Sequence, residues 1–166
     1  RRDAVPEELP IVQFGDDFEL FLDPGPFDIV ACDQDEVAMF LYTSGSTGRP
    51  KGVPLTHYGH LWVIEMRSKG GHIPPHRLLV AAPLYHMNAL AIAKAALLGH
   101  ATIVLLPQFT TEGYVKAVER FQCTWLTSVP TMMALVTKET TLVAGTDVSS
   151  VKIVRMGSAP ATQRLF

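Results

Sequence analysis

The pattern of hydrophobic and polar positions predicts strands and helices in alternation along residues 37–156. Short apolar runs bounded by turn residues indicate strands, and longer amphipathic stretches between them indicate helices. The expected strands are VAMFLYT (37–43), LLVAAP (78–83), ATIVLLP (101–107), CTWLTSV (123–129) and VKIVRM (151–156), and the expected helices cover 56–69, 88–98, 111–121 and 130–138. This order favours a doubly wound α/β fold with a mainly parallel sheet and helices on both faces.

Several local features refine this prediction. VAMFLYT is a continuous apolar run, as in a strand that is buried on both faces. We expect Thr56 and Asn88 to cap the helices that follow them and Gly99 to end the second helix. Pro130 suits the first turn of a helix, whereas residues 139–150 read as a linker.

The two ends of the chain differ from this regular part. Residues 1–36 are rich in acid, proline and glycine, and we expect an acidic lead-in segment with two short strands at 11–14 and 19–22. The α/β unit then covers 37–166. The chain stops at TQRLF, where a helix should be starting, so we expect a fragment of a larger domain.

Composition narrows the class of protein. The 166 residues are 48% hydrophobic with a mean hydropathy of +0.20, which is enough to bury a core. A net charge of -2 argues against a nucleic-acid-binding protein. Lys94, Gly99 and His100 interrupt the longest apolar region, so we expect no transmembrane segment. Cys32 and Cys123 fit no metal spacing and no secretion signal opens the chain, which favours a cytoplasmic protein.

The distribution of charge says more than its total. Eleven of the sixteen acids lie in residues 1–36, whereas between Val37 and Thr111 Glu65 is the only acid against six Lys/Arg and all six histidines. A local positive field of this kind suits an anionic ligand, although chance clustering in an apolar segment is the alternative.

The stretch YTSGSTGRPKG, residues 42–52, follows the first strand and has the composition of a phosphate site. Backbone N–H groups of a glycine-rich loop between a strand and a helix form an anion-binding concavity, and hydroxyl groups and a lysine add donors. Pro50 and Gly52 flank Lys51 where the GxxxxGK[ST] phosphate loop needs Gly and Ser or Thr, and no GxGxxG is present. A flexible linker is the alternative. The candidate phosphate-binding residues are Thr43, Ser44, Gly45, Ser46, Thr47, Gly48 and Lys51.

YTSGSTGRPKGV closely resembles the phosphate-binding signature of the AMP-forming adenylating enzymes, which include acyl- and aryl-CoA synthetases, peptide-synthetase adenylation domains and firefly-type luciferases. PLYHMNAL (83–90), VPTMMALV (129–136) and VKIVRMGSAP (151–160) resemble later elements of that superfamily in the same order. Its tyrosine-glycine-x-threonine-glutamate motif, ribose-binding aspartate and C-terminal lysine domain are absent. Ala161 and Thr162 also depart from its usual leucine-proline.

The resemblance implies an acid:CoA ligase for a fatty acid or a related carboxylate, with ATP, Mg²⁺ and CoA. The carboxylate attacks the α-phosphate of ATP to give an acyl-adenylate and pyrophosphate, and CoA then displaces AMP. By resemblance, residues 43–51 hold the β- and γ-phosphates, and Tyr85 and His86 flank the acyl group, with His86 nearest the reacting carboxylate. The wall of the adenine and acyl pocket is formed by Gly157, Ser158, Ala159 and Pro160.

Under this reading the partners are the carboxylate, ATP, CoA and the missing remainder of the chain, and the fragment alone is inactive. A peptide-synthetase adenylation domain and a stand-alone nucleotide- or phosphate-binding module remain open as alternatives. His57, His60, His72 and His76 invite a metal site, but no acid or cysteine nearby completes the ligand set. No G-x-S-x-G elbow supports a serine hydrolase.

Overall fold

The computed structural model describes residues 10–44, 49–69 and 76–160. The chain forms two compact units, residues 1–31 and 32–166. The first contains one short helix, α1 (Asp16–Phe21), in its described part. The strands expected at 11–14 and 19–22 are therefore wrong. Asp16, Asp17 and Glu19 lie in the first turn of α1, where acidic side chains favour a helix because they offset its dipole.

The second unit begins with an antiparallel hairpin of β1 (Val37–Ser44) and β2 (Pro50–Thr56). The first strand is confirmed, but its burial on both faces is wrong: Phe40 is 60% exposed and Tyr42 is 69% exposed. The second strand was not expected. The glycine-rich stretch consequently joins two antiparallel strands instead of a strand and a helix.

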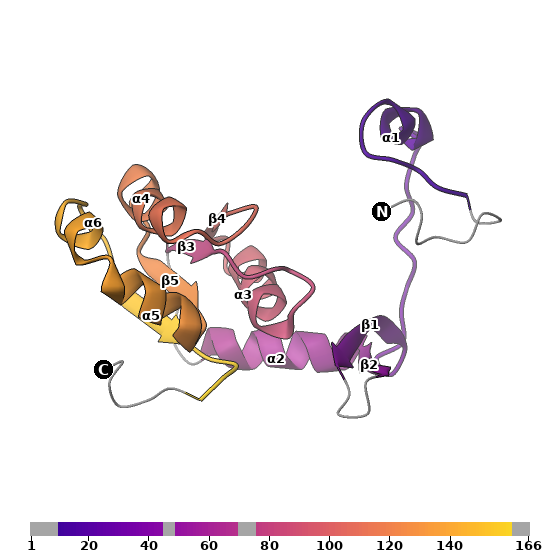
Figure 1. The fold of residues 1–166 in the computed structure, drawn as a ribbon. Coiled ribbons are helices and arrows are strands. Elements are labelled where there is room, and N and C mark those ends of the chain that lie inside the picture. Colours follow the sequence, from indigo (N-terminus) through magenta and orange to yellow (C-terminus); the bar gives the residue numbers. More distant parts are fainter. Residues whose placement is uncertain (1–9, 45–48, 70–75, 161–166) are drawn as a thin grey trace. The chain divides into compact units, whose positions relative to one another are not determined.

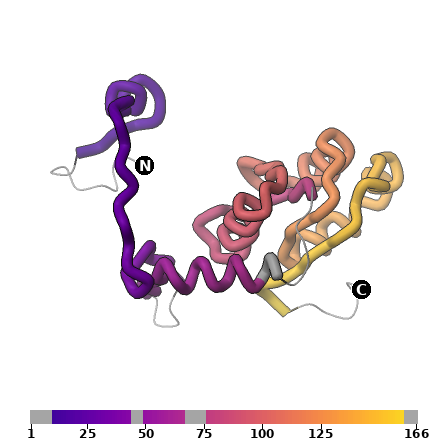
Figure 2. Tube along the Cα trace, turned by 180° about the vertical axis from the view of Figure 1, so that it is seen from behind, coloured from indigo at the N-terminus to yellow at the C-terminus, as the bar shows by residue number. Residues whose placement is uncertain are grey.

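The hairpin and α2 (His57–Lys69) follow one another without a loop. The Thr56 hydroxyl accepts a hydrogen bond from the Gly59 amide at 3.0 Å, which confirms the predicted cap. The amides of His57 and Tyr58 donate to backbone carbonyls of residues 36 and 34, so the helix start is also tied to the segment before β1. Figure 2 traces α2 as a straight rod that runs on from the hairpin.

A four-stranded parallel sheet forms the centre of the second unit (Figure 1). Its order is β4-β3-β5-β6, which confirms the doubly wound parallel sheet. The strands are β3 (Arg77–Val80), β4 (Thr102–Leu105), β5 (Trp125–Ser128) and β6 (Ile153–Met156), and the helices that alternate with them are α3 (Met87–Leu98), α4 (Thr111–Phe121) and α5 (Pro130–Lys138). None of the helices within the described ranges is long and apolar enough to cross a membrane.

Side chains of β3 alternate between two hydrophobic cores, one on each face of the sheet. Leu78 and Val80 pack with Ile64 of α2 and with α3, whereas Leu79 and Ala81 pack with α4 and α5. Helices therefore cover both faces, as predicted. Because β3 is buried on both sides, its sequence reads as a continuous apolar run.

The remaining local predictions concern where the helices begin and end. The bounds expected for α4 and α5 are confirmed, and Gly99 follows the last residue of α3. Asn88 is not a cap, since α3 begins one residue before it and His86 holds the cap position. The expected linker contains a further helix, α6 (Thr140–Ala144), whose short length leaves little periodicity to detect.

Candidate functional site

A cavity of about 1090 Å³ lies at the carboxyl ends of the parallel strands. In the sheet, β3 lies between β4 and β5. The connection that leaves β3 leads to β4 on one side, whereas the connection that leaves β5 leads to β6 on the other side, so the two connections run in opposite directions. Ligands of doubly wound folds bind outside the strand ends at such a switch point. The parallel-strand part of the lining is residues 81–88 after β3, 105–109 at the end of β4, Val129 and Met132 after β5, and Ser158 after β6.

Four of the predicted site residues line this cavity: Thr43, Tyr85, His86 and Ser158. They come from β1, from the loop between β3 and α3, and from the segment after β6, which are far apart in the sequence. The tertiary structure therefore brings these separately predicted segments to one place.

The loop between β3 and α3 presents two aromatic rings side by side. The rings of Tyr85 and His86 lie 4.6 Å apart between centroids, tilted by 53°, and Tyr85 is 72% exposed. The amide of His86 donates to the carbonyl of Pro83 at 3.0 Å, and the carbonyl of His86 accepts from the amide of Leu90 at 3.1 Å. These bonds fix the backbone of His86, while its side chain makes no capping bond to α3.

Lys51 lies in β2 directly opposite Thr43 of β1. Side chains of directly opposed residues in an antiparallel pair share one face, so the ammonium group of Lys51 lies on the same face of the hairpin as the Thr43 hydroxyl. Lys51 is exposed, and the backbone of Ser44 pairs with Pro50 one step further on. The other predicted loop residues, 45–48, and the side chain of Ser44 lie outside the described residues.

The segment after β6 turns sharply at the cavity. The Gly157 amide donates to the Ser128 carbonyl at 3.2 Å, which continues the pairing of β5 with β6. Ser158 then adopts a left-handed backbone with φ of 68°, a conformation that costs an L-residue about 1 kcal/mol or more. Ala159 and Pro160 are exposed and are not among the residues that line the cavity.

Sequence reasoning missed the contribution of several lining residues, notably Asn88, Gln108 and Phe109. Asn88 was assigned to a cap, and the loop after β4 was assigned to no site. Ligands bind beyond the carboxyl ends of parallel strands. Asn88 and the loop after β4 each lie beyond the end of a predicted strand, so this rule could have identified them as candidate site residues. Met132 is in the core, and it also reaches the cavity.

The chemistry of the described lining suits an anionic group beside an apolar one. It carries hydroxyl, imidazole and amide groups among leucine, methionine and phenylalanine side chains, and it includes no acidic residue. Within the described residues, no three His, Cys, Asp or Glu side chains gather where they could hold a metal ion.

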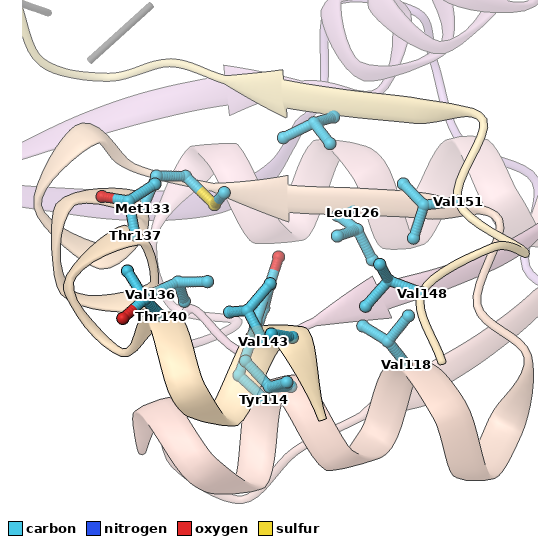
Figure 3. Close-up of a pocket in the computed structure, with 13 residues that line it drawn as sticks. Tyr114, Val118, Leu126, Met133, Val136, Thr137, Thr140, Val143, Val148 and Val151 are labelled. Atoms are coloured by element: carbon cyan, nitrogen blue, oxygen red, sulfur yellow. The ribbon is translucent and has the colours of Figure 1, made fainter. Parts of the chain in front are cut away.

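A second cavity, of about 500 Å³, lies between the sheet and α4, α5 and α6 (Figure 3). Valine, leucine and methionine side chains converge on it, and none of the predicted site residues lines it. The hydroxyl of Tyr114, one of its few polar groups, donates to the carbonyl of Thr127 at 3.0 Å. The lining of this cavity is almost entirely aliphatic, whereas the first cavity carries hydroxyl, imidazole and amide groups and four predicted site residues, so the first cavity is the candidate site.

Comparisons with known proteins identify the family of the chain. The sequence model of the family described as AMP-binding enzyme matches residues 2–166. A feruloyl-CoA synthase from an Amycolatopsis species is 36% identical over 128 residues, which are 76% of this chain and 26% of that protein. The 2-succinylbenzoate–CoA ligase of Bacillus subtilis is 30% identical over 128 residues, again 76% of this chain and 26% of that protein. The chain thus spans about a quarter of the length of these relatives.

Solved structures of adenylate-forming enzymes also resemble the chain. The o-succinylbenzoate coenzyme A synthetase of Bacillus subtilis, in complex with ATP and magnesium ion, superposes with a TM-score of 0.75 at 28% identity, over 90% of this chain and 31% of that one. A luciferase-like enzyme of the mealworm Zophobas morio shares the fold, with a TM-score of 0.77 at 23% identity over 90% of this chain and 35% of that one. From its family match, its fold and its relatives, the chain belongs to the AMP-binding enzyme family.

Proposed function

We propose that the protein to which this chain belongs is an AMP-forming acid:CoA ligase, which activates a carboxylate as an acyl-adenylate and transfers it to CoA. The observation that carries the proposal is the cavity at the strand ends, because it gathers Thr43, the Tyr85–His86 pair and Ser158 at the topological switch point. The relatives act on feruloyl and 2-succinylbenzoyl groups, as their names state. For this protein we propose a fatty acid or a related carboxylate.

The hairpin is the proposed phosphate end of the site. Attack on the α-phosphate leaves pyrophosphate, whose concentrated negative charge needs hydrogen-bond donors and cations. Thr43 supplies a hydroxyl at the cavity, and Lys51 supplies an ammonium group on the same face of the hairpin. Residues 44–48 of the signature complete the phosphate loop in this proposal.

The loop after β3 is the proposed acyl end. Tyr85 and His86 present two adjacent rings to the cavity, and the His86 side chain is not used to cap α3. We propose that the His86 imidazole donates a hydrogen bond to the reacting carboxylate and orients it, while the segment 157–160 forms the wall that the adenine and acyl groups share. Neither cysteine forms a disulfide, which suits the cytoplasmic location that we also propose.

Titration calorimetry with ATP tests the phosphate end directly. Charge-assisted hydrogen bonds contribute roughly 1.5–3 kcal/mol, so Lys51→Ala should weaken ATP binding by about tenfold or more. The matched control is Lys138→Ala, since Lys138 is an exposed lysine at the end of α5 and lines neither cavity. Equal dissociation constants for the wild type and Lys51→Ala would remove Lys51 from the site.

The competing function is a nucleotide-binding module without chemistry, and turnover distinguishes the two. We expect no acid-dependent exchange of pyrophosphate into ATP by the 166-residue chain alone, because the adenine motif and the lysine domain are absent from it. The longer protein that carries this chain should catalyse that exchange. ATP binding without exchange in the longer protein would favour the module.

A further inference from the structure

Lys94 of α3 lies outside the candidate site, at a point where three elements meet. Its Nζ is 3.2 Å from Nδ1 of His60 on α2 and 3.8 Å from Sδ of Met39 on β1. All three side chains are half-buried. A lysine usually keeps its ammonium group in water, so a half-buried one with two partners from other elements requires an explanation.

The two contacts of Lys94 join structural blocks that are otherwise held by apolar packing. The hairpin and α2 form one block, because α2 follows β2 directly and its first amides bond to residues 34 and 36. This block packs on α3 through Ile64, which lies among the alanines of that helix. Apolar packing is non-directional. The contacts of Lys94 are the side-chain hydrogen bonds that the described residues show between this block and α3.

The contact with His60 requires a neutral imidazole. Nδ1 can accept a hydrogen bond from the Lys94 ammonium group only with its lone pair free, which puts the imidazole hydrogen on Nε2. That atom is buried without a hydrogen-bond partner among the described residues. Protonation of His60 would place two cations 3.2 Å apart and break the contact.

The surroundings favour this neutral state. Burial lowers the pKa of His60, and the positive charges of Lys94 and His57 lower it further, while burial also lowers the pKa of Lys94. Glu65 is the acidic residue of α2, five positions beyond His60, and β1 faces the pair with the uncharged Met39. Because the pKa of His60 is lowered in the folded state, the contact is present at neutral pH and is lost only as the pH falls through that lowered pKa.

We propose that Lys94 is a positioning residue that fixes the hairpin bearing Thr43 and Lys51 relative to the start of α3, and that it does so only while His60 is uncharged. α3 begins immediately after His86, and Lys94 lies two turns further along the same helix. The contact therefore links the proposed phosphate end of the site to its acyl end. The consequence for ATP binding rests on the proposed function, whereas the structural link does not.

Backbone amide spectra of Lys94→Met test the link. The variant keeps the length of the side chain and removes the charge, and we expect the resonances of Thr43 and His86 to move. Lys116→Met is the matched control, because Lys116 is also mid-helix and its ammonium group pairs with Glu112 of its own helix. Its resonances at Thr43 and His86 should stay in place. If Lys94→Met leaves both resonances unmoved in a folded chain, the link does not exist.

A second measurement needs no variant. In the wild type, the imidazole nitrogens of His60 and the amides of Thr43 and His86 should titrate together as the pH is lowered from 8 through the lowered pKa of His60. Titration of His60 without any accompanying shift in those amides would overturn the proposal, even if Lys94→Met failed to fold.

ATP affinity supplies the functional readout. Lys94→Met should weaken ATP binding by about three- to tenfold at pH 8, the size typical of indirect coupling between sites. This loss should shrink as the pH falls through the lowered pKa of His60, because the wild type then loses the contact as well. The phosphates of ATP also titrate in this pH range. Each dissociation constant is therefore compared with that of Lys116→Met at the same pH. Lys94→Arg, which keeps the donor, should recover part of the affinity. An absence of ATP binding in the wild type would refute the proposed function, while the spectra would still decide the role of Lys94.

Discussion

The hydroxyl of Tyr114 makes one of two buried hydrogen bonds that together link α4, β5 and β3, and its removal should measurably destabilise the fold. Tyr114 on α4 is 1% exposed and donates to the carbonyl of Thr127 in β5 at 3.0 Å. The hydroxyl of Thr127 in turn donates to the carbonyl of Leu79 in β3 at 2.7 Å. Both bonds are buried, and they link α4 to the two strands that flank the switch point.

Tyr114→Phe isolates the contribution of one of these bonds. Phenylalanine keeps the ring and its edge contact with Phe109, at 5.6 Å between centroids, so no cavity is created. The variant leaves a buried carbonyl without its side-chain donor, which costs roughly 1–2 kcal/mol. For a chain of this length, 1 kcal/mol lowers Tm by about 2–4 °C, so we expect a loss of about 2–8 °C.

Urea unfolding followed by circular dichroism measures the change in free energy of unfolding. Tyr58→Phe is the control, because Tyr58 on α2 is 51% exposed. The control should change the free energy of unfolding by less than about 0.5 kcal/mol. If the two variants unfold at the same urea concentration, the buried hydroxyl bond does not contribute as argued.

The same variant makes a prediction about alkaline pH. Burial raises the pKa of Tyr114 well above its ordinary value, with a smaller effect from Cys123. The folded chain therefore keeps the phenol protonated where the unfolded chain loses its proton. The resulting stabilisation is complete below about pH 10 and is lost as the pH rises further. Tyr114→Phe should lose stability less steeply than the wild type between pH 10 and 11.

Two further predictions concern α4 and the cysteines. The hydroxyl of Thr110 accepts a hydrogen bond from the Gly113 amide at 3.1 Å, so Thr110→Ala should lower the free energy of unfolding by about 1 kcal/mol, measured by urea unfolding, and Thr110→Ser should restore most of it. If Thr110→Ala has the same free energy of unfolding as the wild type, the cap contributes nothing to stability. Cys32 is exposed, whereas Cys123 is buried and its burial raises the pKa of its thiol to about 11. A thiol reagent at pH 8 should therefore label Cys32 quickly and Cys123 only on unfolding, and rapid labelling of two thiols in the folded chain would contradict this placement.

Local sequence predicted the elements of the parallel sheet well and the elements around it poorly. α4 is strongly amphipathic and carries a threonine cap, and α5 opens with a proline, so each has signals at its start and along its length. α1 and α6 have six and five residues, too few for a period to appear. β2 was missed because its glycine and two prolines resemble a loop, although an edge strand tolerates them.

The sequence by itself determined the residue types of the phosphate signature, the alternation of strands and helices, and the family that they resemble. These depend on spacing along the chain. Only the tertiary structure decided that Thr43, His86 and Ser158 share one cavity, and that Lys94 meets His60 and Met39. Periodicity fixes which face of an element is buried but not which element covers it. The neighbours follow from the strand order β4-β3-β5-β6, which packing between distant segments selects.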